Sequence, residues 1–276
     1  MTLNIDKDHF TTTVEVVPPV GPDPGTILEA LASLGDLALD GFNVATNPLA
    51  KPRMSALALS ALIQQRTRKP VILHVTTRDH NRLSLQGLLW GTRALGFDTV
   101  LVSTGDFISL GDRADTTTVR DVDVFDLVRM AREAELRTGV VLNVRTQPDR
   151  WRTEVRWLRY KVEAGAQFVI TQPPYDAAGV ARIEEAISPL GVPVLMGVLP
   201  LRSPEHAEFL HHRVVGIEVP EPVRQRMKEA ADPVAAGAAN AREMVALARR
   251  TFSGACLMPP FGHYEIAFDI LGDGAR

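Results

Sequence analysis

The sequence predicts an α/β protein folded as a single (β/α)8 barrel, and three observations support this prediction. Short β-branched runs recur along the 276 residues with helical stretches between them, the pattern of parallel strands joined by crossover helices. Roughly eight such runs are present, the number at which a parallel sheet closes into a barrel of about 250 residues. No linker, low-complexity tract or internal repeat divides the chain, so residues 1–276 are expected to form one domain.

The strands are expected at short runs rich in Val, Ile, Thr and Phe. In chain order these runs are Thr13–Val17, Gly41–Thr46, Pro70–Thr76, Thr99–Thr104, Thr138–Val144, Phe168–Gln172, Val192–Val198 and Ala255–Met258.

Helices are expected between these runs. Leucines form an apolar stripe between Leu85 and Leu95, and Gly96 is expected to end that helix. A second stripe lies within Trp151–Gly165, where Gly165 occupies the position of a left-handed cap. The segment Pro200–Gly254 is helical in pattern, with a turn-rich elbow at Val219-Pro220-Glu221-Pro222.

Composition excludes several classes of function. The 30 Lys and Arg against 33 Asp and Glu give a net charge of −3 without a dense basic block, so nucleic acid is not an expected partner. No apolar run approaches the roughly 20 residues that span a bilayer, and Met1–Phe10 lacks the apolar centre of a signal peptide, so we expect no membrane segment and a cytoplasmic protein. The single cysteine, Cys256, excludes an intrachain disulfide or a Cys-based metal site within one chain, and we expect it to be a buried small hydrophobe. No metal is expected.

The carboxyl ends of barrel strands carry the site, because the loops that follow them all open on one face. Here these ends are small and polar, as a flat, hydrogen-bonding ligand requires. The candidate residues at them are Glu15, Thr46, Asn47, His74, Ser103, Thr104, Gly105, Asp106, Asn143, Gln172 and His263.

Each strong candidate also has a structural interpretation. Glu15 lies in an apolar strand, facing either the barrel interior or the helices. Burial there would raise its pKa and suit it to general acid catalysis, but it could equally be a solvated or Arg-paired structural glutamate. His74 taken alone is better explained as a core histidine with its hydrogen bonds satisfied. Thr104-Gly105-Asp106 either admits a ligand close to the backbone or forms a type I turn.

Other motifs are weaker. The chain has neither GxGxxG nor GxxxxGK[ST], which disfavours a Rossmann domain and a Walker loop. Trp157 and Tyr160 are neighbours on one helix and either pack there or stack against an aromatic ligand. Asp79 is expected to cap the helix that follows it.

Taken together, the strand ends resemble the 5,10-methylenetetrahydrofolate reductase family, especially the reductase half of bifunctional homocysteine methyltransferase–reductases. The resemblance runs over nearly the whole chain, and the collinear series of motifs carries it rather than any single piece. Its segments include Val14-Glu15-Val16-Val17-Pro18-Pro19, Asn47-Pro48-Leu49-Ala50, His74-Val75-Thr76-Thr77-Arg78-Asp79, Thr104-Gly105-Asp106, Lys161-Val162-Glu163-Ala164-Gly165-Ala166, Ile170-Thr171-Gln172-Pro173 and Met258-Pro259-Pro260-Phe261-Gly262-His263-Tyr264-Glu265.

The resemblance implies a barrel with non-covalent FAD that reduces methylenetetrahydrofolate to 5-methyltetrahydrofolate with NADH or NADPH, in a ping-pong cycle and often as a homo-oligomer. It implies that Glu15 is the general acid and that Asp106 lies between flavin and folate. It also implies that Gln172 and His263 bind folate. The positions that match flavin contacts are Thr46, Asn47, His74, Ser103, Thr104, Gly105, Asp106, Asn143 and Lys161.

Four positions depart from the pattern that relatives show. Tyr160 stands where relatives often have Arg, and Trp157 adds bulk one turn earlier, which weakens the expected pyrophosphate site. His263 replaces a common Arg, and Phe107 replaces a frequent Pro. The residues therefore leave a second function open: a flavin-free pterin- or folate-binding barrel that serves as a methyltransferase component or a non-catalytic subunit.

Overall fold

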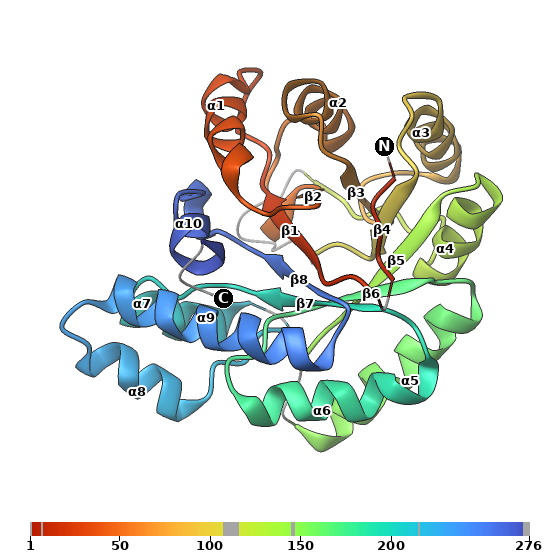
Figure 1. Cartoon of the computed structure of the whole chain (residues 1–276). Coiled ribbons are helices and arrows are strands. Elements are labelled where there is room, and N and C mark those ends of the chain that lie inside the picture. Colours follow the sequence, from red (N-terminus) through yellow and green to blue (C-terminus); the bar gives the residue numbers. More distant parts are fainter. Residues whose placement is uncertain (1, 7, 107–115, 145–146, 215, 273–276) are drawn as a thin grey trace.

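The computed structural model describes residues 2–6, 8–106, 116–144, 147–214 and 216–272. Its parallel strands form a closed barrel in which each strand pairs with the next and the first pairs with the last (Figure 1). The (β/α)8 prediction is confirmed, and each expected strand matches an observed one to within two residues at either end. The strands are β1 (Thr11–Val16), β2 (Gly41–Val44), β3 (Val71–Thr76), β4 (Thr99–Ser103), β5 (Arg137–Leu142), β6 (Phe168–Thr171), β7 (Val194–Val198) and β8 (Gly254–Leu257).

Helices surround the barrel (Figure 1). Within the described part of the chain, none of them is both long and apolar enough to cross a bilayer. They are α1 (Gly25–Ser33), α2 (Ala56–Thr67), α3 (Arg82–Ala94), α4 (Val124–Glu133), α5 (Pro148–Glu163), α6 (Ala177–Ile187), α7 (Pro204–Arg213), α8 (Glu221–Glu229), α9 (Pro233–Thr251) and α10 (Ile266–Leu271).

Most of the expected helix ends are confirmed. Gly96 and Gly165 follow α3 and α5 with φ of +82° and +118°, the left-handed conformation that glycine adopts without a steric penalty. The predicted elbow lies at the start of α8, where Pro220 is the cap. The expected cap at Asp79 is wrong: the Asn81 side chain accepts the bond from the Ser84 amide at 2.9 Å, because Asp79 is held by Arg78.

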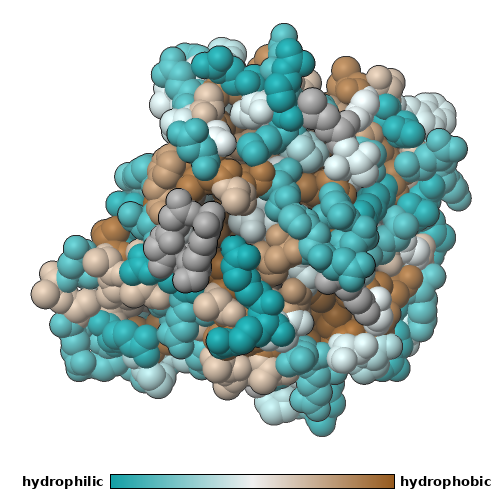
Figure 2. All heavy atoms as spheres, in the orientation of Figure 1, coloured by the Kyte–Doolittle hydropathy of each residue, from teal (hydrophilic) through white to brown (hydrophobic). Residues whose placement is uncertain are grey.

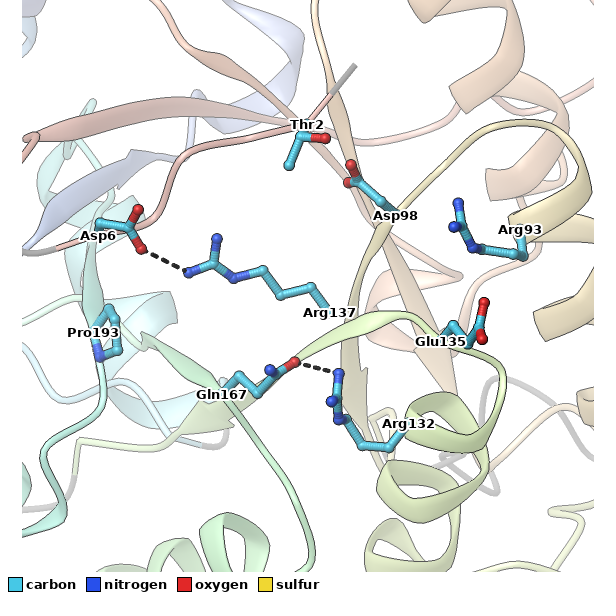
Figure 3. A pocket seen from close by; sticks show the side chains of 9 residues that line it. All are labelled: Thr2, Asp6, Arg93, Asp98, Arg132, Glu135, Arg137, Gln167 and Pro193. Atoms are coloured by element: carbon cyan, nitrogen blue, oxygen red, sulfur yellow. Dashed lines mark hydrogen bonds and ion pairs between the residues drawn. The ribbon is translucent and has the colours of Figure 1, made fainter.

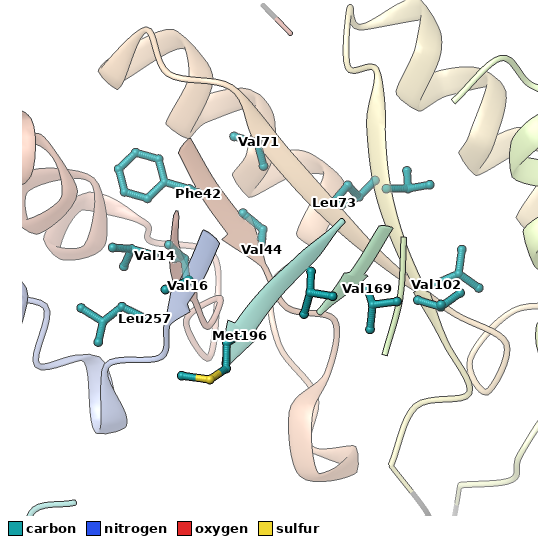
Figure 4. Close-up of a cluster of buried hydrophobic side chains, with 14 of the residues drawn as sticks. Val14, Val16, Phe42, Val44, Val71, Leu73, Val102, Val169, Met196 and Leu257 are labelled. Atoms are coloured by element: carbon teal, nitrogen blue, oxygen red, sulfur yellow. The ribbon is translucent and has the colours of Figure 1, made fainter. Parts of the chain in front are cut away.

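Alternation along each strand separates two apolar clusters. One set of side chains packs between the barrel wall and the helices, and includes Val14, Val16, Phe42, Val44 and Leu73 (Figure 4). The alternate residues point into the barrel, where Ile72, Leu101, Phe168, Ile170 and Leu195 form a second cluster. This second cluster fills the inside of the barrel with side chains. On the outside, the face seen in Figure 2 carries mostly hydrophilic side chains.

The N-terminal segment closes the barrel at the amino ends of the strands. Leu3 and Ile5 belong to the interior cluster and are 1% and 0% exposed. The Arg137 guanidinium holds this segment by donating hydrogen bonds to the carbonyl oxygens of Leu3 and Ile5, at 3.3 and 2.7 Å. These contacts stabilise the amino-terminal end of the barrel.

A shallow basin of about 630 Å³ lies at this same end (Figure 3). Several of its charged side chains have partners within the protein: Asp6 pairs with Arg137, and Arg132 donates to Gln167 at 2.6 Å. The basin is on the face opposite the strand-end loops, so it takes no part in the candidate site.

Gly139 in β5 provides a test of the interior packing. A Cβ added there would lie 2.3 Å from the ring of Phe168 in β6. We expect Gly139→Ala to destabilise the protein by about 1–3 kcal/mol through overpacking, measured by urea unfolding. Gly87→Ala is the control, since Gly87 lies in α3 with open space around it, and alanine there should stabilise the helix by up to about 1 kcal/mol. Equal stability of Gly139→Ala and the unchanged protein would contradict this packing.

Candidate active site

Glu15 is the only acidic residue in β1 and points into the barrel near its carboxyl end. Its neighbours Val14 and Val16 face the helices, so alternation turns Glu15 to the interior side. Burial, and secondarily the negative charge of Asp106, raises its pKa to about 7. The side chain keeps some solvent exposure. Glu15 is thus a carboxylic acid that is substantially protonated at neutral pH and within reach of a ligand at the strand ends.

Asp106 follows β4 and lies close enough to Glu15 to affect its pKa. Its Oδ2 accepts a 2.6 Å hydrogen bond from the Leu49 amide in the loop after β2. That loop is unusual, because Asn47, Leu49 and Ala50 all have positive φ, between 43° and 55°. Such conformations in non-glycine residues cost about 1 kcal/mol or more each and cluster at functional sites. The two carboxylates of the sequence prediction therefore meet at the same mouth.

His74 in β3 is partly buried on the interior side of the barrel, and its hydrogen bonds are not satisfied. Its Nε2 is a buried atom without a partner in the described part of the chain. Burial lowers its pKa to about 4, so the ring is neutral at physiological pH. Asn43 Oδ1, inside the barrel on β2, is buried and unpartnered as well. Because an unpaired buried polar atom costs roughly 1–3 kcal/mol, this arrangement suits a ligand that completes the hydrogen bonding.

Small polar contacts order the neighbouring strand ends. Thr46 Oγ1 donates to the His74 carbonyl at 2.6 Å, which ties the ends of β2 and β3 together. Ser103 Oγ accepts from the Gly105 amide at 3.3 Å, and Gly105 has φ of +79°. Thr104 is exposed beside them. Residue 107, where phenylalanine departs from the family pattern, lies outside the described residues.

The residues expected at the cofactor phosphates lie against the barrel wall. Lys161 Nζ donates to the Val141 carbonyl at 2.9 Å, and burial lowers its pKa. Asn143 Nδ2 donates to both carboxylate oxygens of Glu154 at 3.1 Å, and Glu154 opposes the pKa shift of Lys161. Asn143, Glu154 and Lys161 therefore form a group of their own at β5 and α5.

Trp157 and Tyr160 pack on Phe125 of α4. Their ring centroids lie 5.6 and 6.4 Å from that of Phe125. Both side chains are nearly half exposed, on the outer side of α5. Of the two interpretations of this pair, packing within the protein or stacking against an aromatic ligand, the structure shows the packing.

Two predicted folate-binding residues occupy separate loops. Gln172 follows β6, where its backbone N–H donates to the Leu142 carbonyl at 2.8 Å. His263 lies after β8, with Nδ1 2.7 Å from Glu265 Oε1 on an exposed surface. Among the described residues, no three His, Cys, Asp or Glu side chains are grouped to hold a metal ion. Cys256 is fully buried, as expected, and burial raises its thiol pKa.

Sequence reasoning missed two residues at this site. Tyr264 is 3% exposed and close to Glu15, and burial together with the Glu15 charge raises its pKa to about 12. Arg78 is also 3% exposed, and its guanidinium bonds to residues of three loops. Both residues lie within the motifs quoted in the sequence analysis. Arg78 could have been noticed there as a charged side chain two residues after an apolar strand.

Comparison with known proteins identifies the family. The family profile described as methylenetetrahydrofolate reductase matches residues 1–254. A Caenorhabditis elegans protein named probable methylenetetrahydrofolate reductase (NADPH) is 22% identical over 227 residues. That match covers 79% of this chain and 34% of the relative, so the chain spans about a third of its relative's length.

Solved structures agree on the fold. A Clostridium thermocellum protein that binds two copies of 5-methyl-5,6,7,8-tetrahydrofolic acid superimposes with a TM-score of 0.72 at 14% identity, over 98% of this chain and 96% of the other. A 2,3-dimethylmalate lyase gives 0.54 at 15% identity, over 95% and 80%. The barrel is common to all three, and the profile that matches most of the chain shows that this protein belongs to the methylenetetrahydrofolate reductase family.

Proposed function

We propose that this protein reduces 5,10-methylenetetrahydrofolate to 5-methyltetrahydrofolate, with NADH or NADPH as the hydride donor. The observation that carries the proposal is Glu15, a partly buried carboxylic acid with a raised pKa near a second carboxylate, in a chain of this family. A tetrahydrofolate ligand is further supported by the structural neighbour from Clostridium thermocellum, which binds 5-methyltetrahydrofolate.

In this proposal Glu15 supplies the proton. Its acid form donates the proton to N10 of the folate, and the bond between N10 and the methylene carbon breaks. The resulting iminium carbon, bonded to N5, then accepts the hydride to become the methyl group. Asp106 accepts hydrogen bonds from the pterin ring, and its negative charge adds to the effect of burial in raising the pKa of Glu15.

FAD is the cofactor that the family implies, and the residues at the ring end of its expected site fit a flavin. His74 Nε2 is buried without a partner in the described structure, so a polar atom of a flat ring would satisfy it. Thr46, Ser103 and Gly105 border the same strand ends. Bound FAD would carry the hydride from the nicotinamide to the folate.

The phosphate end supports a second candidate function. Lys161 is bonded to the Val141 carbonyl, and Asn143 beside it is bonded to Glu154. These contacts favour the alternative of a flavin-free barrel that binds a pterin or folate, as a methyltransferase component or a non-catalytic subunit.

The visible spectrum of the purified protein, before and after incubation with excess FAD and desalting, separates the two functions. We expect a flavin band that bleaches with NADH or NADPH and returns with methylenetetrahydrofolate. Free FAD taken through the same desalting is the control. A colourless protein that binds 5-methyltetrahydrofolate but retains no FAD would contradict the flavin-dependent reductase and support the second function.

A further inference from the structure

Arg78, in the loop after β3, connects the loops that follow three neighbouring strands. Its Nε and Nη2 donate to the two carboxylate oxygens of Asp79 at 2.6 and 2.7 Å. Nη1 donates to the backbone carbonyl of Asp106 at 2.9 Å, and Nη2 also donates to the carbonyl of Asn47 at 3.1 Å. One buried guanidinium thus binds the β2, β3 and β4 loops at once.

The acceptors of Arg78 are themselves linked. The Asn47 side chain donates to Asp79 Oδ2 at 3.1 Å and accepts from the Arg53 amide at 2.9 Å. The left-handed turn that begins at Asn47 presents the Leu49 amide to Asp106 Oδ2. Asp106 is therefore fixed twice: its carbonyl by Arg78 directly, and its carboxylate through the turn whose first carbonyl Arg78 binds.

We propose that Arg78 is a positioning residue that places the Asp106 carboxylate opposite Glu15, an inference that rests on the proposed function. The arrangement needs the planar, forked guanidinium, because two backbone carbonyls and both oxygens of one carboxylate accept from it together. A lysine ammonium keeps the charge but, as a single donor centre, cannot span these acceptors. Gly105 is part of the same packing: a Cβ there would lie 3.2 Å from Arg78 Nη1.

Arg137 offers a matched control at the opposite end of the barrel. Its guanidinium also donates to two backbone carbonyls, those of Leu3 and Ile5, and lies near a carboxylate, that of Asp6. Arg78→Lys and Arg137→Lys therefore remove similar bonds, one set at the candidate site and one set far from it.

The first measurement is amide hydrogen exchange at Leu49 in the full-length protein, which needs no substrate. We expect exchange at Leu49 to become at least tenfold faster in Arg78→Lys, since its acceptor loses its support, and to stay unchanged in Arg137→Lys. Unchanged exchange at Leu49 in a folded Arg78→Lys protein would overturn the inference.

The second measurement is steady-state turnover of methylenetetrahydrofolate at temperatures where all variants are folded. We expect Arg78→Lys to lower kcat/KM by about 100-fold, the effect of a misplacement of about 1 Å, and Arg137→Lys to change it less than twofold. Guanidinium ion added to Arg78→Ala should restore part of the activity. Equal losses in both lysine variants without rescue would overturn the inference. If the unchanged protein neither binds nor reduces the folate, the proposed function fails, while the exchange result still tests the placement of Asp106.

Discussion

Replacing Glu15 with glutamine is expected to lower the rate of methylenetetrahydrofolate reduction by about 10² to 10⁴-fold, the contribution that a positioned general acid makes. The amide has nearly the shape of the protonated carboxyl but cannot give up a proton to N10. Reduction of bound flavin by NADH or NADPH does not use this proton and should remain near its original rate. Stopped-flow absorbance of the two half-reactions measures both.

The control for this substitution is Glu29→Gln, at an exposed position on α1. It removes an exposed carboxylate on an outer helix and should change neither half-reaction. If Glu15→Gln reduced the folate as fast as the unchanged protein, the acid role would have to be abandoned.

The pH dependence of the folate step follows from the same residue. In the proposed reaction only protonated Glu15 can give its proton to the folate, and its pKa is raised to about 7, so activity is expected to be high at low pH and to fall as the pH rises through about 7. Rate constants measured from pH 5.5 to 9 should show this single loss. A profile that instead rises with pH across this range would assign the proton to another group.

Glu15→Gln is also expected to stabilise the fold above neutral pH, by about 3 kcal/mol. The pKa of Glu15 rises from 4.5 to about 7 on folding, so the folded state holds its proton more tightly than the unfolded state. Each pKa unit corresponds to 1.36 kcal/mol, so the protein with Glu15 loses about 3 kcal/mol of folding stability as the pH rises from about 4.5 to 7. Glutamine cannot ionise and escapes this loss.

Urea unfolding at pH 5 and pH 8 measures the effect. The stability difference between Glu15→Gln and the unchanged protein should be small at pH 5 and close to its full size at pH 8. Glu29→Gln, at an exposed position on α1, is measured alongside it as the control. A difference of the same size at both values would mean that packing around residue 15, and not its ionisation, sets the stability.

The barrel was predictable because its signals are local. Strands buried on both faces are short apolar runs, and glycines such as Gly96 and Gly165 mark the helix ends without reference to the rest of the fold. The cap at Asp79 was not predictable in this way. Its carboxylate is taken by Arg78 and by Asn47 of another loop, so Asn81 caps the helix.

The candidate site was predictable only in part. The sequence named Glu15 and Asp106 but left open whether Glu15 faces the barrel interior or the helices, and the structure turns it to the interior, near Asp106. The bonds of Arg78 escaped sequence reasoning, because its acceptors come from three loops and two of them are backbone carbonyls that any residue would present. The packing of Trp157 and Tyr160 depends on Phe125 from a different helix, which helical spacing within α5 does not reveal.

The pairing of β1 with β8 makes the surroundings of Glu15 depend on the last strand of the barrel. Glu15 lies on the strand that closes the barrel, and Thr11 of that strand pairs with Gly254, close to the other end of the sequence. Tyr264, which lies close to Glu15, comes only after β8. During synthesis, Glu15 therefore reaches its final surroundings only after β8 has been made. A chain that stops before β8 leaves this edge of β1 unpaired, so Glu15 then lacks the surroundings on which its proposed role depends.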